Sequence, residues 1–571
     1  MATIVQTRAR AQTAPRGARV IILLIVWIAI TAFQFTAVAA FAQVAGATDR
    51  DQIRALVARG TLRQLRRADF APFRPALEEI YRETDYAPRW LPAGTAAGAV
   101  LAEISDAASH GLDPADYDVD WIGGEIRAIQ AGDRAPERIA RADVALTVSF
   151  CRFLSDLSRG RVTPEQAGFK FGRDEKPLDL PALVRSGMTT GRWHDVVASA
   201  EPSFPLYRRL KEALARYRSF ATVSPPPLPP LPSGKRKIVP GESYAGVAAL
   251  SERLRLVGDL PPATPAPTDD KYQGALVDGV RAFQSRHGLK DDGVLGKDTL
   301  DQLGTPVSAR LRQIELSLER LRWLPEAPPG PLIAVNIPSF RLWAFAYGRN
   351  DVTPQVTMPV IVGRAMKARE TPVFIGEMHR VEFSPYWNVT PAIQRGEIVP
   401  KLERDGAAGY WNAEGLEAVS VDGKGEPITV LDAKTIEGLK SGALRVRQRP
   451  GPKNALGGVK FVLPNTMNIY LHSTPAQELF SQTRRDFSHG CIRVEDPPAL
   501  AAFVLRDQPA WTPERIRDAM AAGKLNTVSL AQPIPVVLFY TTAIVDSVGR
   551  DLFSSDIYGL DTKLESALRT R

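Results

Sequence analysis

The chain has 571 residues, of which 44% are hydrophobic and 24% are charged. This ordinary globular balance excludes a fully disordered, collagen-like or polytopic membrane protein, and the length predicts about three or four domains at roughly 150 residues each. Lys and Arg number 72 against 63 Asp and Glu, which gives a net charge of +9. That mild excess fits an anionic cell surface as well as nucleic acid. The two cysteines, Cys151 and Cys491, are too few for a disulfide scaffold or a four-cysteine zinc site.

The N-terminus has the features of a secretory signal. Residues 1–19 carry arginines and no acidic residue, residues 20–42 carry no charge, and Ala40-Phe41-Ala42 supplies a small-residue cleavage site. The uncharged run is also long enough to span a bilayer, so an uncleaved anchor in the inner membrane is the alternative reading of 1–42. Both readings place the rest of the chain outside the cytoplasm, and we expect a periplasmic protein.

Residues 50–223 predict a helical scaffold domain. Apolar residues recur at helical spacing over 51–65 and, more regularly, over 142–157. Cys151 lies in the second of these helices among apolar neighbours, which indicates a buried structural thiol. No motif with catalytic chemistry occurs in this region.

A proline-rich linker, 224–240, separates the scaffold from a small module at 241–305. The module's apolar pattern and its glycines predict three short helices, at 247–256, 278–287 and 297–303.

The pattern changes to short alternating strands over 330–545, which predicts a mainly β domain. Strand-like runs occur at 333–347, 356–362, 458–463, 468–472 and 534–540. The charged, glycine-rich stretch 391–450 reads as an inserted lid subdomain, and 546–571 as a C-terminal tail.

The second cysteine has the surroundings of a reactive thiol. Gly490 precedes Cys491 and permits a sharp turn, while His489 and Arg493 flank the thiol with positive charge, which favours the thiolate. Asp496 and the proline after it predict the start of a helix, whose positive end would act in the same direction.

A thiol nucleophile needs a base within hydrogen-bond reach. His489 is two residues from Cys491. His472 ends a predicted strand in which Asn468, Tyr470 and His472 share one face. His379 shows no motif. Chemistry alone does not rank His472 above His489.

The pattern from His472 to Val494, with SHGCIRV at its end, resembles the active-site signature of the L,D-transpeptidase (YkuD-type) catalytic domain. SPYWNVTPAI at 384–393 and PGPKNALGGVKFVLPNTMNIYLHSTP at 450–475 resemble the large, multidomain branch of that family. VRAFQSRHGLKDDGVLGKDTLDQL at 280–303 resembles the peptidoglycan-binding type 1 module, although a long insert separates its first two helices.

The resemblance implies a multidomain α+β protein with a helical N-terminal scaffold, a three-helix peptidoglycan-binding module and a mainly β catalytic domain with an inserted lid. It also favours His472 as the base, held by Ser473. It implies that Cys491 attacks a stem peptide, that D-Ala leaves, and that a second stem accepts the acyl group in a 3–3 crosslink. Backbone N–H groups at Gly490 and Cys491 would hold the oxyanion. Further residues expected at the substrate are Arg493, Ser488, Tyr470 and Trp387.

No metal or other cofactor is expected, and no nucleic acid. The expected partners are peptidoglycan stem peptides and glycan, with other wall-synthesis enzymes as further candidates, and the resemblance implies acylation by carbapenems. Two alternatives remain: an L,D-carboxypeptidase-type hydrolase using the same thioester, and a non-catalytic wall-binding protein. A disulfide between Cys151 and Cys491 would remove the nucleophile.

Overall fold

The computed structural model describes residues 48–91, 95–169, 176–223, 225–326, 329–346, 353–404 and 407–570. The predicted signal segment lies outside them. Within the described residues, no helix is both long and apolar enough to cross a membrane. Contacts between residues divide the chain into two compact units, one formed by residues up to 97 with 120–148, the other by 98–119 with 149–571.

The first unit is helical, as predicted. It contains α2 (Asp49–Arg59), α3 (Arg74–Arg82), most of α5 (Val119–Gln130) and parts of α4 (Thr95–Ser105) and α6 (Pro136–Arg159). The helix α2 ends before the predicted residue 65 because Gly60, at φ 69°, terminates it. Buried Asp143 accepts hydrogen bonds from the Tyr81 hydroxyl at 2.7 Å and the Trp90 N–H at 2.8 Å, which compensates for burying a carboxylate.

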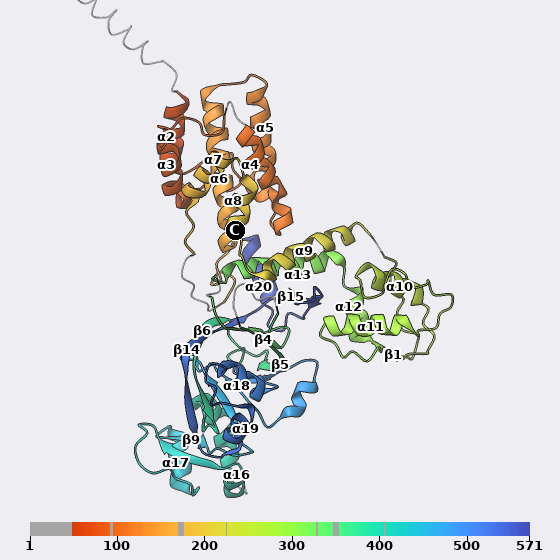
Figure 1. Cartoon of the computed structure of the whole chain (residues 1–571), viewed down its shortest axis with the longest axis vertical. Coiled ribbons are helices and arrows are strands. Elements are labelled where there is room, and N and C mark those ends of the chain that lie inside the picture. The colour runs from red at the N-terminus through yellow and green to blue at the C-terminus, as the bar shows by residue number, and fades with distance from the viewer. Residues whose placement is uncertain are drawn as a thin grey trace, which may run out of the picture. The chain divides into compact units, whose positions relative to one another are not determined.

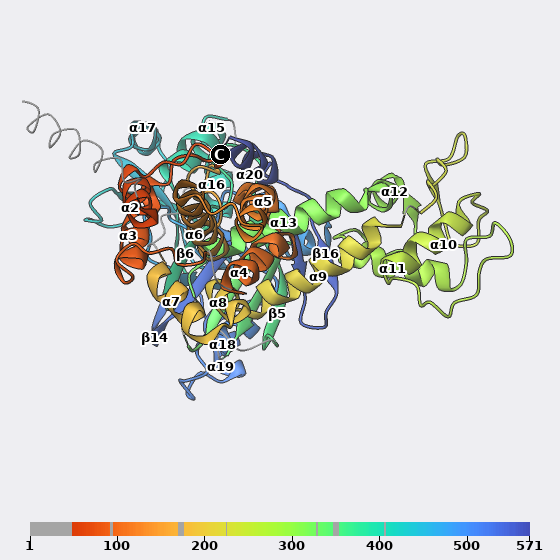
Figure 2. The same cartoon turned by 90° about the horizontal axis from the view of Figure 1, so that it is seen from above.

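In the second unit, α9 and α13 lie side by side (Figures 1 and 2). Outside the small module, its helices before the catalytic region include α7 (Leu180–Thr190), α8 (Trp193–Ala200), α9 (Pro205–Ala221) and α13 (Val307–Trp323). Tyr207, Leu210 and Leu214 of α9 share a buried cluster with Phe539. Since Phe539 belongs to the catalytic region, the end of the predicted scaffold packs with that region. Cys151, also in this unit, is fully buried, and burial raises the pKa of its thiol to about 12.

The small module forms the three predicted helices. Its elements are β1 (Lys237–Ile238), α10 (Val247–Leu256), α11 (Ala275–Arg286), β2 (Leu295–Gly296) and α12 (Lys297–Gly304). Gln284 explains much of the module's sequence motif. Its side-chain amide donates to Val294 O at 3.0 Å and to Thr299 Oγ1 at 3.1 Å, and its oxygen accepts the Gly293 N–H at 2.8 Å. These motif residues therefore hold the module together.

The catalytic region is built on a nine-stranded sheet in the described part of the chain, with the order β12-β5-β13-β11-β10-β6-β14-β3-β4. Pairing of β4 with β5 closes it into a barrel. The strands are β3 (Leu332–Asn336), β4 (Arg341–Phe345), β5 (Val356–Gly363), β6 (Phe374–Phe383), β10 (Val459–Val462), β11 (Leu471–His472), β12 (Asp486–Ser488), β13 (Ile492–Val494) and β14 (Asn526–Phe539). The prediction of a mainly β domain is confirmed.

Helices α18 (Pro497–Val504) and α19 (Pro513–Ala521) follow β13. Asp496 accepts the Ala499 N–H at 3.0 Å, so the predicted N-cap is present. Leu500 and Val504 then face the barrel core.

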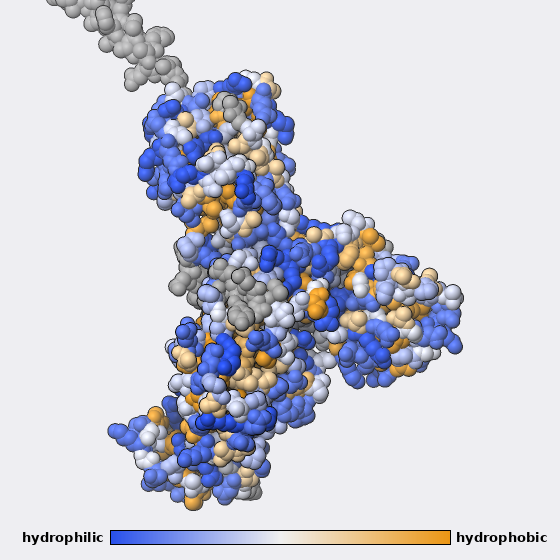
Figure 3. Space-filling model, viewed as in Figure 1, coloured by the Kyte–Doolittle hydropathy of each residue, from blue (hydrophilic) through white to orange (hydrophobic). Residues whose placement is uncertain are grey.

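The lid has a core of its own. It consists of β7 (Trp387–Asn388), α14 (Pro391–Ile393), the π-helix η4 (Gln394–Ile398), α15 (Val399–Leu402), α16 (Ala407–Ala413), β8 (Leu416–Ser420), α17 (Ala433–Ser441) and β9 (Leu444–Gln448). Strands β7, β9 and β8 form a separate sheet around buried Trp411 and Leu439. Two apolar side chains of the lid, Val421 and Val430, are exposed. The face of the molecule seen in Figure 3 is mostly hydrophilic.

The C-terminal residues do not form an appended tail. Strand β15 (Ala543–Val545) pairs with β16 (Asp551–Phe553), and α20 (Leu560–Arg569) follows. Tyr558, Leu560 and Leu564 belong to the barrel's main core. Apolar burial therefore makes 546–570 part of the catalytic region.

Candidate active site

Two parallel strands place the reactive residues on one face. Strands β11 and β13 pair with Leu471 opposite Ile492 and His472 opposite Arg493. Leu471 and Ile492 lie in the barrel core. Because side chains alternate along a strand, His472 and Arg493 face the other side, together with Cys491 just before Ile492.

The thiol of Cys491 is half-buried and donates a hydrogen bond to Asn468 O at 3.4 Å. Burial raises its pKa, although the backbone and hydroxyl of Tyr470 and the charges of Lys460 and Arg493 oppose that effect. The charge of Arg493 acts in the expected direction, but burial outweighs it and the pKa of the thiol is raised overall. The start of α18 is also separated from the thiol by β13.

Asn468 does not share the extended face predicted for 468–472. Its φ of 55° lies in the left-handed region, and β11 spans Leu471–His472 alone. The Asn465 side chain fixes this turn by accepting the N–H groups of Met467 and Ile469, both at 3.0 Å. The turn aims the Asn468 carbonyl at the thiol, a role that the sequence pattern did not reveal.

His472 is buried, with 5% of its surface exposed. Burial, with a smaller effect of the Arg493 charge, lowers its pKa to about 3. Its Nδ1 lies 2.5 Å from the Ser473 carbonyl oxygen. A carbonyl can only accept, so Nδ1 carries the proton and Nε2 is left as the basic nitrogen. Ser473 thus holds the ring through its backbone.

No hydrogen bond joins Cys491 to His472 or to His489 among the described residues. Catalytic hydrogen bonds are often long before substrate binds. His489 contacts the lid instead. Its Nε2 lies 2.6 Å from Glu397 Oε1, and Arg369 Nη2 lies 3.0 Å from the same oxygen. Sequence reasoning missed both partners because they lie far from His489 in the chain.

The loop that carries the nucleophile is braced by hydrogen bonds. Ser488 donates its hydroxyl to Cys491 O at 2.6 Å and accepts the Gly490 N–H at 3.1 Å. Thr371 donates to Gly490 O at 2.7 Å, and its N–H donates to the Tyr558 hydroxyl at 3.2 Å. Gly490 has φ 122°, which requires glycine. Ser488 therefore has a structural task beside its predicted contact with substrate.

The charges of Lys460 and Arg493 act on the thiol of Cys491. Arg493 makes no ion pair within the described residues, and burial together with the charge of Arg364 lowers its pKa. Lys460 lies 4.5 Å above the Tyr470 ring.

Trp387 lies in the lid sheet, opposite Gln448. The described residues contain no group of His, Cys, Asp or Glu suited to a metal ion.

Both cysteines are free thiols, so the alternative disulfide is absent.

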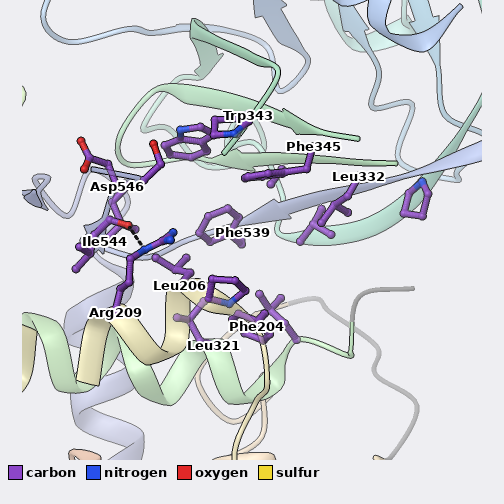
Figure 4. A pocket seen from close by; sticks show the side chains of 18 of the residues that line it. Phe204, Leu206, Arg209, Leu321, Leu332, Trp343, Phe345, Phe539, Ile544 and Asp546 are labelled. Atoms are coloured by element: carbon purple, nitrogen blue, oxygen red, sulfur yellow. Dashed lines mark hydrogen bonds between the residues drawn. The ribbon is translucent and has the colours of Figure 1, made fainter. Parts of the chain in front are cut away.

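A separate apolar cavity of about 180 Å³ lies between α9 and the barrel. In Figure 4, Phe539 lies between Trp343 and Phe345 on one side and Leu206 on the other. No candidate site residue lines this cavity, so the chemistry belongs elsewhere.

Comparison with known families identifies the region that contains Cys491. Residues 330–516 match the family model of the L,D-transpeptidase catalytic domain. The chain carries an L,D-transpeptidase catalytic domain. Residues 243–303 match a model described as "Putative peptidoglycan binding domain", and residues 75–214 match the scaffold domain. These matches confirm the predicted resemblance, in which a scaffold domain, a peptidoglycan-binding module and an L,D-transpeptidase catalytic domain occur in one chain.

A curated protein from Haemophilus influenzae, named "Putative L,D-transpeptidase", is similar to part of this chain. It is 31% identical over 256 residues, which are 45% of this chain and 49% of the relative. The chain thus spans about half the length of this relative. A crystal structure of a fused Zn-dependent amidase/peptidase/peptidoglycan-binding protein from Clostridium acetobutylicum covers 53% of this chain and 99% of its own. At 12% identity and a TM-score of 0.17, it carries no argument about fold or function.

Proposed function

We propose that this protein is a peptidoglycan L,D-transpeptidase that forms 3–3 crosslinks between stem peptides through a thioester on Cys491. The observation that carries the proposal is the shared face of β11 and β13, where Cys491, His472 and Arg493 lie together. This arrangement combines a nucleophile, a base and an anion-binding group. The catalytic domain itself supports the reaction class.

In the first step, His472 Nε2 takes the thiol proton and Cys491 Sγ attacks the carbonyl carbon of the third stem residue. With a pKa of about 3, Nε2 is unprotonated near neutral pH and available to accept the proton, but the same burial makes it a weaker base than a free imidazole. The carbon–nitrogen bond to D-Ala then breaks, and the leaving amine takes the proton from His472. D-Ala departs and a thioester remains.

The oxyanion of this step needs donors that are not already engaged. The Gly490 N–H donates to Ser488 Oγ, so we assign the main role to the Cys491 N–H rather than to both groups equally.

In the second step, the side-chain amine of an acceptor stem attacks the thioester carbon. His472 Nε2 takes a proton from that amine as the new amide forms, the carbon–sulfur bond breaks, and the departing thiolate takes this proton from His472.

Arg493 is the group best suited to a carboxylate of the stem. Its guanidinium has two-point geometry for carboxylates, and it makes no ion pair among the described side chains. Arg364 lies close enough to lower its pKa, so a bound carboxylate would relieve repulsion between two cations. Tyr470 and Trp387 remain proposed contacts in the donor cleft.

The domain content suggests an extracytoplasmic location, with peptidoglycan as the partner of the small module. Export through the segment 1–42, its alternative role as an anchor, and association with other wall enzymes are proposals. The module would hold the catalytic domain near insoluble substrate and raise its local concentration.

The test is incubation of the purified protein with soluble tetrapeptide fragments, followed by mass spectrometry. We expect dimers with 3–3 links and one D-Ala released per link. Cys491→Ala should abolish both products, whereas the matched variant Cys151→Ala should keep activity and lose only some core packing. Release of D-Ala without dimers would favour the hydrolase, and 3–3 dimers from Cys491→Ala would contradict the thioester.

A further inference from the structure

The protonation of the contact between His489 and Glu397 follows from its partners. Burial alone would raise the pKa of Glu397, but the hydrogen bond from His489 and the charges of Arg369 and Arg364 lower it overall. Glu397 is therefore a carboxylate and can only accept. At 2.6 Å, His489 Nε2 must carry the hydrogen that it donates.

Arg369 completes the cluster without competing for that hydrogen. Its Nη1 lies 3.3 Å from His489 Nε2, but a guanidinium only donates, so it does not bond a nitrogen that already bears hydrogen. Its Nη2 binds Glu397 Oε1 at 3.0 Å instead. The carboxylate thus receives two charge-assisted contacts, one from His489 in the loop that carries Cys491 and one from Arg369.

Glu397 is held firmly by the lid. It lies on the π-helix η4, a wide turn that is frequent at functional sites. Two positions beside it anchor that turn: Ile398 is 4% exposed, and the Gln394 amide donates to Leu439 O and Leu444 O, both at 2.9 Å. A displacement of the lid would therefore move the carboxylate with it.

His489 is equally well connected to the nucleophile. Gly490 alone separates it from Cys491, and the Gly490 carbonyl and N–H are both tied, to Thr371 and Ser488. The imidazole has no hydrogen bond to the thiol in the described residues. The hydrogen bond between His489 and Glu397 therefore connects the lid to the short loop that carries Cys491.

We propose that Glu397 is a positioning residue, which fixes His489 through its Nε2–H and so couples the placement of the lid to the geometry of the Cys491 loop. This inference rests on the proposed transpeptidase function for its kinetic consequence. With the lid in place, His489 is oriented and the loop is ordered. With the carboxylate removed, His489 loses its acceptor and the loop becomes more mobile.

The kinetic test compares Glu397→Gln with Glu403→Gln. Glu403 binds Lys440 at 2.7 Å inside the lid, so its variant is a matched loss of a lid ion pair. We expect Glu397→Gln to slow acylation of Cys491 by a soluble tetrapeptide about ten-fold in kcat, with little change in KM, and Glu403→Gln to be unaffected. Glu397→Asp should recover part of the rate, because it restores the charge.

A double variant separates positioning from general support. If Glu397 acts through His489, Glu397→Gln should cost nothing further in a His489→Ala background. An equal cost in both backgrounds would overturn the proposal, as would an equal loss in Glu403→Gln. The melting temperature of each variant establishes that it is folded.

A second readout does not depend on substrate. The chain has six histidines, so ¹⁵N-histidine labelling of the full chain resolves each ring by NMR. We expect Glu397→Gln to shift the Nε2–H signal of His489 and to speed hydrogen exchange at 488–491, with Glu403→Gln matching the native protein. Unchanged signals and exchange would overturn the inference. If these changes occur in a protein that forms no crosslinks, the proposed function fails and the coupling of lid and loop stands.

Discussion

His472 stands opposite Arg493 across the parallel strands β11 and β13. Burial and, to a smaller extent, this guanidinium keep the imidazole neutral by lowering its pKa to about 3. The proposed base and the proposed anion-binding group are thus linked: the Arg493 cation that would attract a substrate carboxylate also disfavours protonation of His472, less strongly than burial does. A change at Arg493 should therefore alter both substrate binding and the pH dependence of the reaction rate.

Arg493→Met should weaken stem-peptide binding about 10–100-fold, as expected for a lost charge-assisted bond of about 1.5–3 kcal/mol. It should also move the acid limb of the rate profile to higher pH, because removing the cation raises the pKa of His472. Measurement of kcat and KM from about pH 2 to 9 checks both effects, because the acid limb of the native protein should lie near the His472 pKa of about 3. An acid limb at an unchanged pH would contradict the electrostatic link.

His472→Ala should slow acylation of Cys491 about 10²–10⁴-fold near neutral pH. The defect should shrink at alkaline pH, where solvent deprotonates the thiol directly. Because burial raises the pKa of Cys491, this recovery should require a pH above the usual thiol range. Intact-protein mass spectrometry with a carbapenem as the acylating probe measures the rates.

His489→Ala is the comparison for that experiment. Its defect should be smaller and should not be rescued selectively at alkaline pH, because the ring contacts Glu397 rather than the thiol. If His489→Ala is the more severe variant and alkaline pH rescues it alone, the base is assigned to the wrong histidine.

Thr371→Val should lower the free energy of unfolding by about 1–3 kcal/mol, because it leaves the Gly490 carbonyl and the Gly363 N–H without their hydroxyl partner. It should also slow acylation by loosening the loop. Denaturant titration and kinetics check this. The control is Thr222→Val, which removes an exposed hydroxyl that donates to Ser219 O and should change neither quantity.

Removing 241–305 should weaken binding to insoluble peptidoglycan more than it slows turnover of a soluble tetrapeptide. A small loss of stability is also expected, because the His287 ring stacks on Phe553 at 5.7 Å between centroids. Pelleting assays and soluble kinetics measured side by side provide the comparison. Equal losses in both would show that the module braces the catalytic domain.

Local elements could be predicted well because their signals lie within a few residues. The helix 247–256 and the N-cap at Asp496 match the structure, since apolar period and capping are short-range properties. The motif from His472 to Val494 likewise indicated the family, because it lies in one short stretch of the chain. The prediction for 468–472 was wrong at its start although the cause is local: the alternating pattern did not reveal the left-handed turn at Asn468, which the nearby Asn465 side chain fixes.

The sequence by itself determined the three-part organisation, the nucleophile's motif and the strand that carries His472, because each is encoded in local spacing. Tertiary structure alone decided the state of the thiol, whose pKa is raised by burial despite nearby cations. It also decided that His489 faces Glu397, a residue 92 positions away, and that Tyr558 braces Thr371 across 187 positions. Desolvation and long-range hydrogen bonds depend on which segments fold together, and no local pattern in the chain records them.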